Sequence, residues 1–276
     1  MFNISANAKA ALEELLETSV RPTPTNWHKV KLGKLDIGLV SPEVLFELNQ
    51  FINQENTEIS LIQADGDHIV FNNSIPNDLS FELRVISEYL RDKGFISGWR
   101  NEDFSHIEEN GHEHFRLERA AFRTFGLQSR AVHINGYTSN QCLWLAKRSL
   151  SKATHPGLLD NIAAGGINAD ETIRTSAIRE LWEEAGIPRE IALGINPIGA
   201  IPSLRLVPPR GLHHETLFTF DLFLPEDFTP TNQDGEVSSF ELIKYEDALE
   251  LLFTESLTPD AMVVTADFLL RKTNAS

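Results

Sequence analysis

Residues 165–187 read GGINADETIRTSAIRELWEEAGI and carry the strongest signal in the chain. On a helix, Glu180, Glu183 and Glu184 stand at positions i, i+3 and i+4, so their carboxylates project from one face. Three like charges on one stripe repel each other and destabilise an isolated helix. A bound divalent cation removes that repulsion, and carboxylate oxygens are ligands that suit Mg²⁺ or Mn²⁺. A solvated acidic helix face is the alternative interpretation.

The other residues of this stretch fill a known signature at every defined position. Gly165 precedes Glu171 by six residues, Arg179 follows Glu171 by eight, and Gly186 comes after the acidic residues. The frame is G-x5-E-x7-R-E-U-x-E-E-x-G-U, the Nudix box, in which U is a bulky aliphatic residue. The chain therefore resembles the Nudix hydrolases, and the complete match argues against a merely solvated face. The resemblance implies an α+β fold, an α-β-α sandwich with a mixed β-sheet and the box helix.

The resemblance also implies roles for these residues, because Nudix enzymes cleave a diphosphate linkage with the help of bound metal ions. Mg²⁺ is the expected cofactor, with Mn²⁺ as a substitute. The metal ligands that it implies are the box carboxylates and one backbone carbonyl, those of Glu180, Glu183, Glu184 and Gly165. Arg179 is expected to orient the carboxylates and to pair with Glu171. Glu184, Arg179 and Glu236 form the expected catalytic set, since family members often take the general base from an acidic residue well past the box. A further metal ligand is the alternative role for Glu236.

The composition limits the classes of protein to which the chain can belong. A chain of 276 residues can bury a substantial core, as one large domain or two modest ones. Its formal net charge of −16 argues against a broad nucleic-acid footprint, so no nucleic-acid partner is expected. The single cysteine, Cys142, excludes an intrachain disulfide and the zinc-binding cysteine cluster of NADH-cleaving Nudix enzymes. Neither a signal-peptide pattern nor a membrane-length apolar run is seen, so we expect a cytoplasmic protein without a membrane partner.

Strand and helix patterns divide the chain near residue 125. The elements expected in the first part are a helix at 5–20, a strand at 34–40, a helix that starts at residues 41–42, strands at 58–62 and 68–72, a helix at 79–93 and a helical segment at 119–123. From residue 129 onward, strands flank the box helix, and two helices follow. We therefore predict a smaller α+β amino-terminal domain at 1–125 and a Nudix hydrolase domain at 126–276. The amino-terminal domain is expected to position the substrate, to cover the site or to form a homodimer interface.

Short strings outside the box resemble one group of Nudix proteins. Residues 117–126 read LERAAFRTFG, residues 132–137 read VHINGY and residues 232–237 read NQDGEV. They resemble the Nudix proteins related to thiamine pyrophosphokinase, which carry an extra amino-terminal domain. The resemblance implies hydrolysis of thiamine diphosphate, or of its oxidised or antimetabolite analogues, to the monophosphate. The candidate substrate-binding residues are groups suited to a phosphate or a ring system, namely Arg205, His133, Asn135, Tyr137, Trp99 and Arg100. The alternative for most of them is an ordinary structural role.

Three functions stay open on the sequence alone. The leading one is Mg²⁺-dependent hydrolysis of a small-molecule diphosphate. A nucleotide-sugar or dinucleotide pyrophosphatase of the ADP-ribose type is the nearest alternative. A non-catalytic ligand-binding regulator is the third, but such regulators often lose the box carboxylates, and this chain retains all of them.

Overall fold

The computed structural model describes residues 2–53, 59–72, 75–108, 110–209 and 211–274. Its helices are α1 (Ala6–Glu17), α2 (Pro42–Ile52), α3 (Pro76–Asp92), α4 (Arg119–Thr124), α5 (Ile173–Ala185), α6 (Arg189–Ala192), α7 (Tyr245–Leu251) and α8 (Pro259–Asn274). Its strands are β1 (His28–Leu32), β2 (Leu35–Val40), β3 (Ile62–Asp65), β4 (His68–Phe71), β5 (Asp103–Ile107), β6 (Glu113–Glu118), β7 (Ser129–Tyr137), β8 (Cys142–Arg148), β9 (Leu159–Asn161), β10 (Ala163–Gly166), β11 (Asn196–Val207), β12 (Gly211–Phe223) and β13 (Val237–Lys244).

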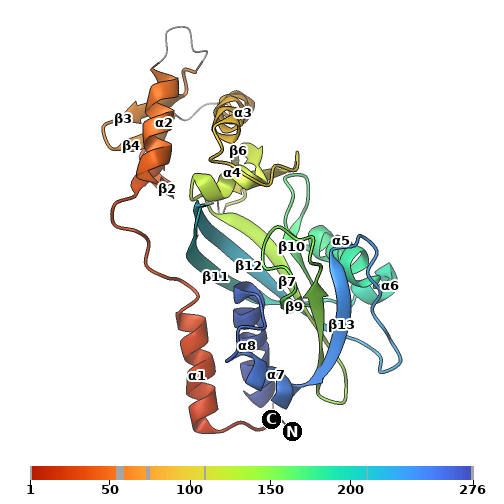
Figure 1. The fold of residues 1–276 in the computed structure, drawn as a ribbon. Coiled ribbons are helices and arrows are strands. Elements are labelled where there is room, and N and C mark those ends of the chain that lie inside the picture. The colour runs from red at the N-terminus through yellow and green to blue at the C-terminus, as the bar shows by residue number, and fades with distance from the viewer. Residues whose placement is uncertain (1, 54–58, 73–74, 109, 210, 275–276) are drawn as a thin grey trace.

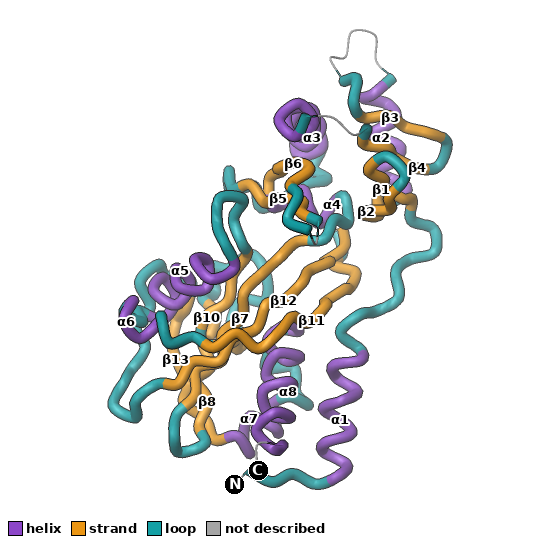
Figure 2. Tube along the Cα trace, turned by 180° about the vertical axis from the view of Figure 1, so that it is seen from behind, coloured by secondary structure: helices purple, strands orange, loops and turns teal. Residues whose placement is uncertain are grey.

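The central layer is a seven-stranded sheet with the strand order β11-β12-β7-β8-β13, to which β10 adds on β7 and β9 adds on β8. β12 and β7 run parallel, whereas the other strand pairs of this sheet are antiparallel. α5 packs on one face of the sheet, and α8 lies on the other with α1 and α7 beside it (Figures 1 and 2). The predicted α-β-α sandwich with a mixed sheet is therefore confirmed.

β7 organises these layers because both of its faces are covered. Val132 and Ile134 point into the core under α5, whereas Ala131 packs against residues of α8, as the alternation of a strand requires. β7 pairs with β10 through residues 131–134 but with β8 through residues 136–137. The sheet therefore divides beside β7, with β10 on one side of the division and β8 and β9 on the other.

A smaller α+β unit comes between α1 and β7 in the chain. Its four-stranded sheet has the order β2-β1-β4-β3. α2 and α3 pack against β3 and against each other. The β5–β6 hairpin and α4 then lead into β7. Phe71 contacts the rings of Phe115 and Phe125 edge to face at the centre of its own core. Phe104 of β5 lies against Gly166 of β10, where an added Cβ would come within 2.3 Å of the ring. Gly166 therefore lets the smaller unit dock beside the strand that leads to the box.

The position of α1 corrects one part of the predicted domain division. The predicted helix forms, but it packs beside α8 rather than with the rest of residues 1–125 (Figure 1). Phe2 and Leu12 belong to the core cluster of α7 and α8, and Val20 bridges to Leu204 of β11. An amphipathic helix packs wherever a matching apolar face is available, and position in the chain does not determine that face. The boundary near residue 125 stays a prediction for the remaining segment.

Two strands of the smaller unit also differ from expectation. The strand expected at 58–62 begins at Ile62 instead, and residue 58 lies outside the described residues. β1 was not expected, yet it pairs in parallel with β4 and closes a hairpin with β2. None of the described helices is long and apolar enough to cross a membrane.

Candidate active site

Caps at both ends of α5 fix the direction of its acidic face. The Thr172 hydroxyl accepts the N–H of the third helical residue in a capping box. Gly186 ends the helix with a φ of 61°, in the left-handed region that favours glycine. Leu181 is fully buried in the core between α5 and the sheet. Glu180 and Glu184 stand beside this apolar face and are nine-tenths buried against β10.

Glu184 is a buried carboxylate without an ion pair in the described part of the chain. Its Oε2 accepts the backbone N–H of Ala164 at 2.9 Å. Burial, reinforced by the nearby Glu180, raises the pKa of Glu184 well above its usual range, and the Lys152 ammonium only partly opposes this. A cation at this corner would therefore restore the ionised form of Glu184.

Gly165 leaves room for the Glu180 carboxylate, which occupies the place that a side chain at this position would take. A Cβ at Gly165 would lie 2.0 Å from Glu180 Oε1. Burial raises the pKa of Glu180, although the Arg179 guanidinium opposes that rise. β10 and the Glu180 carboxylate of α5 are thus in direct contact.

We predict that Gly165→Ala lowers kcat/KM for diphosphate hydrolysis by about a hundredfold, because the displaced Glu180 carboxylate can no longer hold its position. The folding free energy should change little, since the clashing atom is the end of a flexible side chain. Parallel kinetic and thermal-denaturation measurements check this. Gly199→Ala is the matched control, because an added Cβ there meets nothing within 4 Å. Full activity in Gly165→Ala would contradict the assigned position of Glu180.

Arg179 joins the carboxylates of the box, as predicted. Its Nε and Nη2 donate to the two Glu171 carboxylate oxygens at 2.7 and 2.9 Å, a bidentate pair. Its Nη1 donates to Glu180 at 2.8 Å and to Glu183 at 2.9 Å. Burial disfavours the charged guanidinium, but these carboxylates outweigh burial and raise the pKa of Arg179. Arg179 therefore fixes the positions of three acidic side chains at once.

We predict that Arg179→Lys destabilises the fold by about 2–4 kcal/mol, because one ammonium cannot satisfy carboxylates that a planar guanidinium joins. Urea denaturation measures the loss. Arg174→Lys on the exposed side of α5 is the control and should change stability by about 0.5 kcal/mol or less. Equal stability of the two variants would show that the Arg179 network contributes nothing measurable.

Glu236 reaches the same corner from the turn before β13. One carboxylate oxygen pairs closely with Lys152, and the other accepts a hydrogen bond from Arg100 Nη1 at 3.2 Å. Burial acts to raise the pKa of Glu236, but Lys152 and Arg100 outweigh it and lower that pKa. Glu236 is therefore ionised and can accept a proton. The Lys152 charge also acts to lower the pKa of Glu184, so one ammonium influences both carboxylates.

The residues at this corner fit a hard divalent cation. Glu184 is a buried carboxylate without an ion pair in the described residues, and Glu180 is nearly as buried. Both carboxylates approach the backbone of β10. Carboxylate and backbone oxygens are the ligand set of Mg²⁺. Glu183 is more exposed and turns to Arg179, so its place as a third ligand stays a prediction.

A second group of candidate metal ligands, His213, Glu215 and Asp260, is the one set of three in the described residues whose ligand atoms lie within 4.8 Å of one another. The Arg205 guanidinium binds both oxygens of Asp260, at 2.7 and 2.8 Å. Arg123 lies beside His213, with 3.5 Å between its Nη2 and His213 Nδ1. Two fixed cations already stand at this cluster, so we interpret it as a charge network rather than a metal centre.

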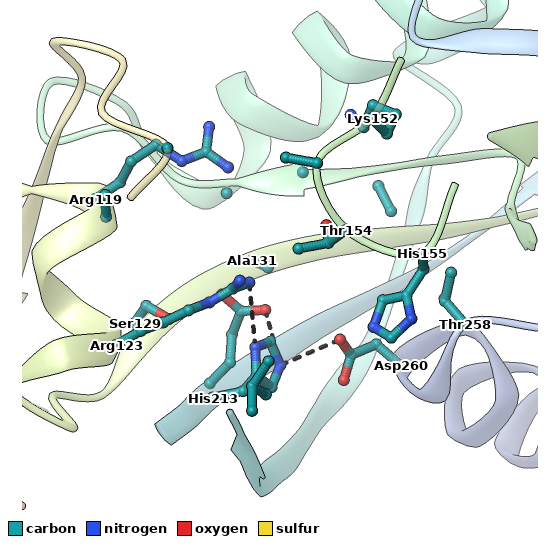
Figure 3. A pocket seen from close by; sticks show the side chains of 18 of the residues that line it. Arg119, Arg123, Ser129, Ala131, Lys152, Thr154, His155, His213, Thr258 and Asp260 are labelled. Carbon is teal, nitrogen blue, oxygen red and sulfur yellow. Dashed lines mark hydrogen bonds and ion pairs between the residues drawn. The ribbon is translucent and has the colours of Figure 1, made fainter. Parts of the chain in front are cut away.

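A polar cavity of about 220 Å³ connects the two clusters. Glu180, Gly165 and Glu236 line one end. His213 and Asp260, which Figure 3 labels, line the other. Its walls come from both sides of the divided sheet, from the β5–β6 region and α4, and from the start of α8. The cationic side chains in its lining are Arg100, Arg119, Arg123, Arg148, Lys152 and Arg205. These six cations offset the five carboxylates of the lining, so this cavity can admit a small anionic ligand although the chain has a net charge of −16.

The comparison with protein families agrees with this geometry. Residues 128–263 match the NUDIX domain family. The chain carries a Nudix domain. The matched segment contains β7, β10, α5 and the Glu236 turn, so it includes every residue at the acidic corner of the cavity.

The similarity to known proteins extends beyond residues 128–263. Nudix hydrolase 20, chloroplastic, of Arabidopsis thaliana is 39% identical over 201 residues, which are 71% of this chain and 54% of that protein. Nudix hydrolase 24, chloroplastic, of the same plant is 36% identical over 213 residues, 75% of this chain and 58% of that protein. Uncharacterized protein YJR142W of Saccharomyces cerevisiae is 27% identical over 243 residues, 82% of this chain and 69% of that protein. The chain thus spans little more than half the length of the two plant relatives.

The predicted substrate residues of the Nudix protein divide into two sets. His133, Arg100 and Arg205 line the cavity, although Arg205 is committed to Asp260. Trp99 and Tyr137 are not among the lining residues. The Trp99 indole donates to Asn101, and Arg91 lies over its ring. The Tyr137 ring packs with Phe223 and Phe268, under Lys272. These contacts give both rings structural roles and correct the sequence-based assignment.

Asn135 is fully buried and acts on the cavity only through other residues. Its Nδ2 donates to Asp221, and its Oδ1 accepts from Asn161 Nδ2. Asn161 Oδ1 therefore accepts a hydrogen bond from His133 Nδ1–H at 2.9 Å. This chain of bonds places a proton on His133 Nδ1 and fixes the orientation of the ring. Asn135 was predicted to touch substrate, and the structure makes it a support for His133 instead.

One functional candidate, Arg123, was not singled out from the sequence. Lys152 is a loop cation that the sequence offers as a phosphate or substrate contact, and in the structure it contacts Glu236, 84 positions away. Arg123 belongs to the string LERAAFRTFG, which was noted for its resemblance rather than for its charge. The sequence did offer one signal for Arg123. It is a cation in a short helical segment just before the strand that carries the candidate substrate residues His133 and Asn135.

Proposed function

We propose that this chain is a Mg²⁺-dependent Nudix hydrolase that cleaves a diphosphate linkage in a small molecule. The observation that carries the proposal is Glu184, a buried carboxylate without an ion pair in the described chain, beside Glu180, which lines one end of the cavity. Such a carboxylate is costly unless a cation joins it. All box positions are also intact, which a non-catalytic binding protein does not need.

The residues that would hold the cation are Glu180 and Glu184, with Glu183 and the Gly165 carbonyl as further ligands. When bound, the cation supplies Lewis-acid stabilisation of the charge that develops on the phosphate oxygens. Arg179 keeps the carboxylates in register through its three partners. Glu236 is ionised and accepts the proton of the attacking water, and Lys152 and Arg100 beside it attract the phosphate groups.

The substrate that we propose is thiamine diphosphate or an oxidised or antimetabolite analogue of it, cleaved to the monophosphate. The strings at 117–126, 132–137 and 232–237 support this choice, because each contributes a residue to the cavity: Arg123, His133 and Glu236. The small size of the cavity also favours a compact ester over a macromolecule.

A substrate panel tests the proposal. kcat/KM is measured with Mg²⁺ for thiamine diphosphate, its oxo and oxy analogues, ADP-ribose, NADH and nucleoside triphosphates, with products separated by chromatography. The highest kcat/KM is expected for a thiamine compound. A higher kcat/KM for ADP-ribose or NADH would support the assignment as a diphosphate hydrolase and would contradict the assignment of thiamine diphosphate as the substrate. A Glu184→Gln preparation, purified in parallel, shows whether a contaminating hydrolase produces the signal.

A further inference from the structure

Arg123 enters the cavity from α4, outside the acidic corner where Glu180, Glu184 and Glu236 meet. Its backbone is held tightly, because Gly211 at the start of β12 lies so close that an added Cβ would be 2.0 Å from the Arg123 carbonyl oxygen. Its side chain projects from the helix toward Ser129 and His213 (Figure 3). The smaller unit thus ends in a helix that contributes a fixed guanidinium to the cavity.

Arg123 differs from the other cations that line the cavity by having no carboxylate partner. Each of the others pairs with an acidic side chain within the described residues: Arg100 and Lys152 with Glu236, Arg119 with Glu102, Arg148 with Asp160, and Arg205 with Asp260. No carboxylate of the described chain is within ion-pairing distance of Arg123. A guanidinium carries five N–H donors, and most of those of Arg123 are left for a ligand.

Within the described residues, the one polar contact of the Arg123 side chain, with His213, shows how its donors are oriented. Nη2 lies 3.5 Å from His213 Nδ1, and His213 Nε2 lies 3.1 Å from Asp260 Oδ2. The imidazole therefore stands between the Arg123 guanidinium on its Nδ1 side and the Asp260 carboxylate on its Nε2 side. Asp260 is itself held by Arg205. His213 therefore steadies one edge of the guanidinium without neutralising its charge.

The register of β7 shows that Arg123 lies at the far end of the cavity from the acidic corner. Ala164, whose N–H binds Glu184, pairs with His133. Ser129, next to Arg123 in Figure 3, pairs with Glu215 of β12. Four residues of strand separate Ser129 from His133, a length of about 13 Å. Ala131 lies between them and lines the cavity with a small side chain.

We propose that Arg123 binds an acceptor oxygen at the end of the substrate remote from its diphosphate, and so determines which diphosphates are selected. This inference rests on the proposed function, which places the diphosphate at the acidic corner. A guanidinium has no acceptor and cannot bind an amino group or an ammonium. The oxygen is either a ring carbonyl or an anionic group such as a second phosphate, and both meet Arg123 through the same N–H donors.

Matched ligand pairs test the inference by calorimetry, with Ca²⁺ replacing Mg²⁺ to suppress turnover. In two pairs, thiamine diphosphate with oxythiamine diphosphate and ADP with IDP, the second ligand has a ring carbonyl in place of an amino group. In the third pair, ADP with ADP 2′-phosphate, the second ligand carries an additional anionic group. The wild-type protein should bind the oxygen-bearing member of at least one pair about tenfold more tightly. The pair that shows the preference identifies the source of the oxygen.

Arg123→Gln should abolish that preference, and Arg123→Lys should retain part of it, because lysine keeps a charged donor. Arg84→Gln is the control for loss of an arginine, since Arg84 is exposed and pairs with Asp103 away from the cavity. Equal binding within every pair, or a preference that survives in Arg123→Gln, would overturn the inference and leave the proposed function intact. Failure of every diphosphate to bind would overturn the proposed function and the inference together.

Discussion

Glu184→Gln is expected to lower kcat/KM for diphosphate hydrolysis by about 10⁴-fold, the largest effect of any single change in this protein. The substitution keeps the shape of the side chain, and the amide oxygen can still accept the Ala164 N–H. It removes the charge that the cation requires. Because burial already disfavours the charged form of Glu184, the folding free energy should stay the same or increase.

Thermal denaturation separates this loss from unfolding, and Glu183→Gln supplies a graded comparison. Glu183 is partly exposed and bound to Arg179, so its amide variant should lose about ten- to a hundredfold. Substantial turnover by Glu184→Gln, with unchanged dependence on Mg²⁺, would show that Glu184 is not a metal ligand.

The second large effect is expected for Glu236→Gln, with kcat lower by about 10³-fold. An amide cannot accept the proton of the attacking water. Lys152 and Arg100 lose their partner in this variant and become free to bind phosphate, so KM should stay equal or fall. Steady-state kinetics at several substrate concentrations resolve kcat and KM.

Glu241→Gln is the control for that experiment, because Glu241 is exposed on the same strand, β13. It should leave both constants unchanged. If Glu236→Gln raised KM without lowering kcat, Glu236 would be a binding residue, and the general base would have to be sought elsewhere in the cavity.

The box helix and the strands around it could be predicted because their signals are local. Positions i, i+3 and i+4 place Glu180, Glu183 and Glu184 on one face of any helix, whatever surrounds it. The order of strands and helices after residue 129 likewise restricts the layers to a few arrangements. The resemblance to the Nudix hydrolases implied the Arg179–Glu171 pair, and the structure contains it.

The rest depended on contacts between distant residues. Nothing local in α1 indicates that its apolar face meets α8 rather than the smaller unit. The polarity of Asn135 is equally compatible with touching a ligand and with supporting His133, and only its neighbours Asn161 and Asp221 decide between them. Arg205 was predicted to bind phosphate. Its pairing with Asp260 could not be foreseen, because Asp260 lies 55 residues away in the chain. Charge in a sequence shows no partner, so paired and unpaired arginines could not be distinguished.

The central claim is that the acidic corner of the cavity holds a divalent cation for diphosphate cleavage. Hydrolysis of thiamine diphosphate and ADP-ribose, followed by chromatography before and after metal removal with EDTA, tests it most directly. We predict that at least one of the two is cleaved, that EDTA abolishes cleavage and that added Mg²⁺ restores it in the wild-type protein but not in Glu184→Gln. Cleavage that continues at the same rate in EDTA, or restoration of Glu184→Gln by Mg²⁺, would contradict the claim.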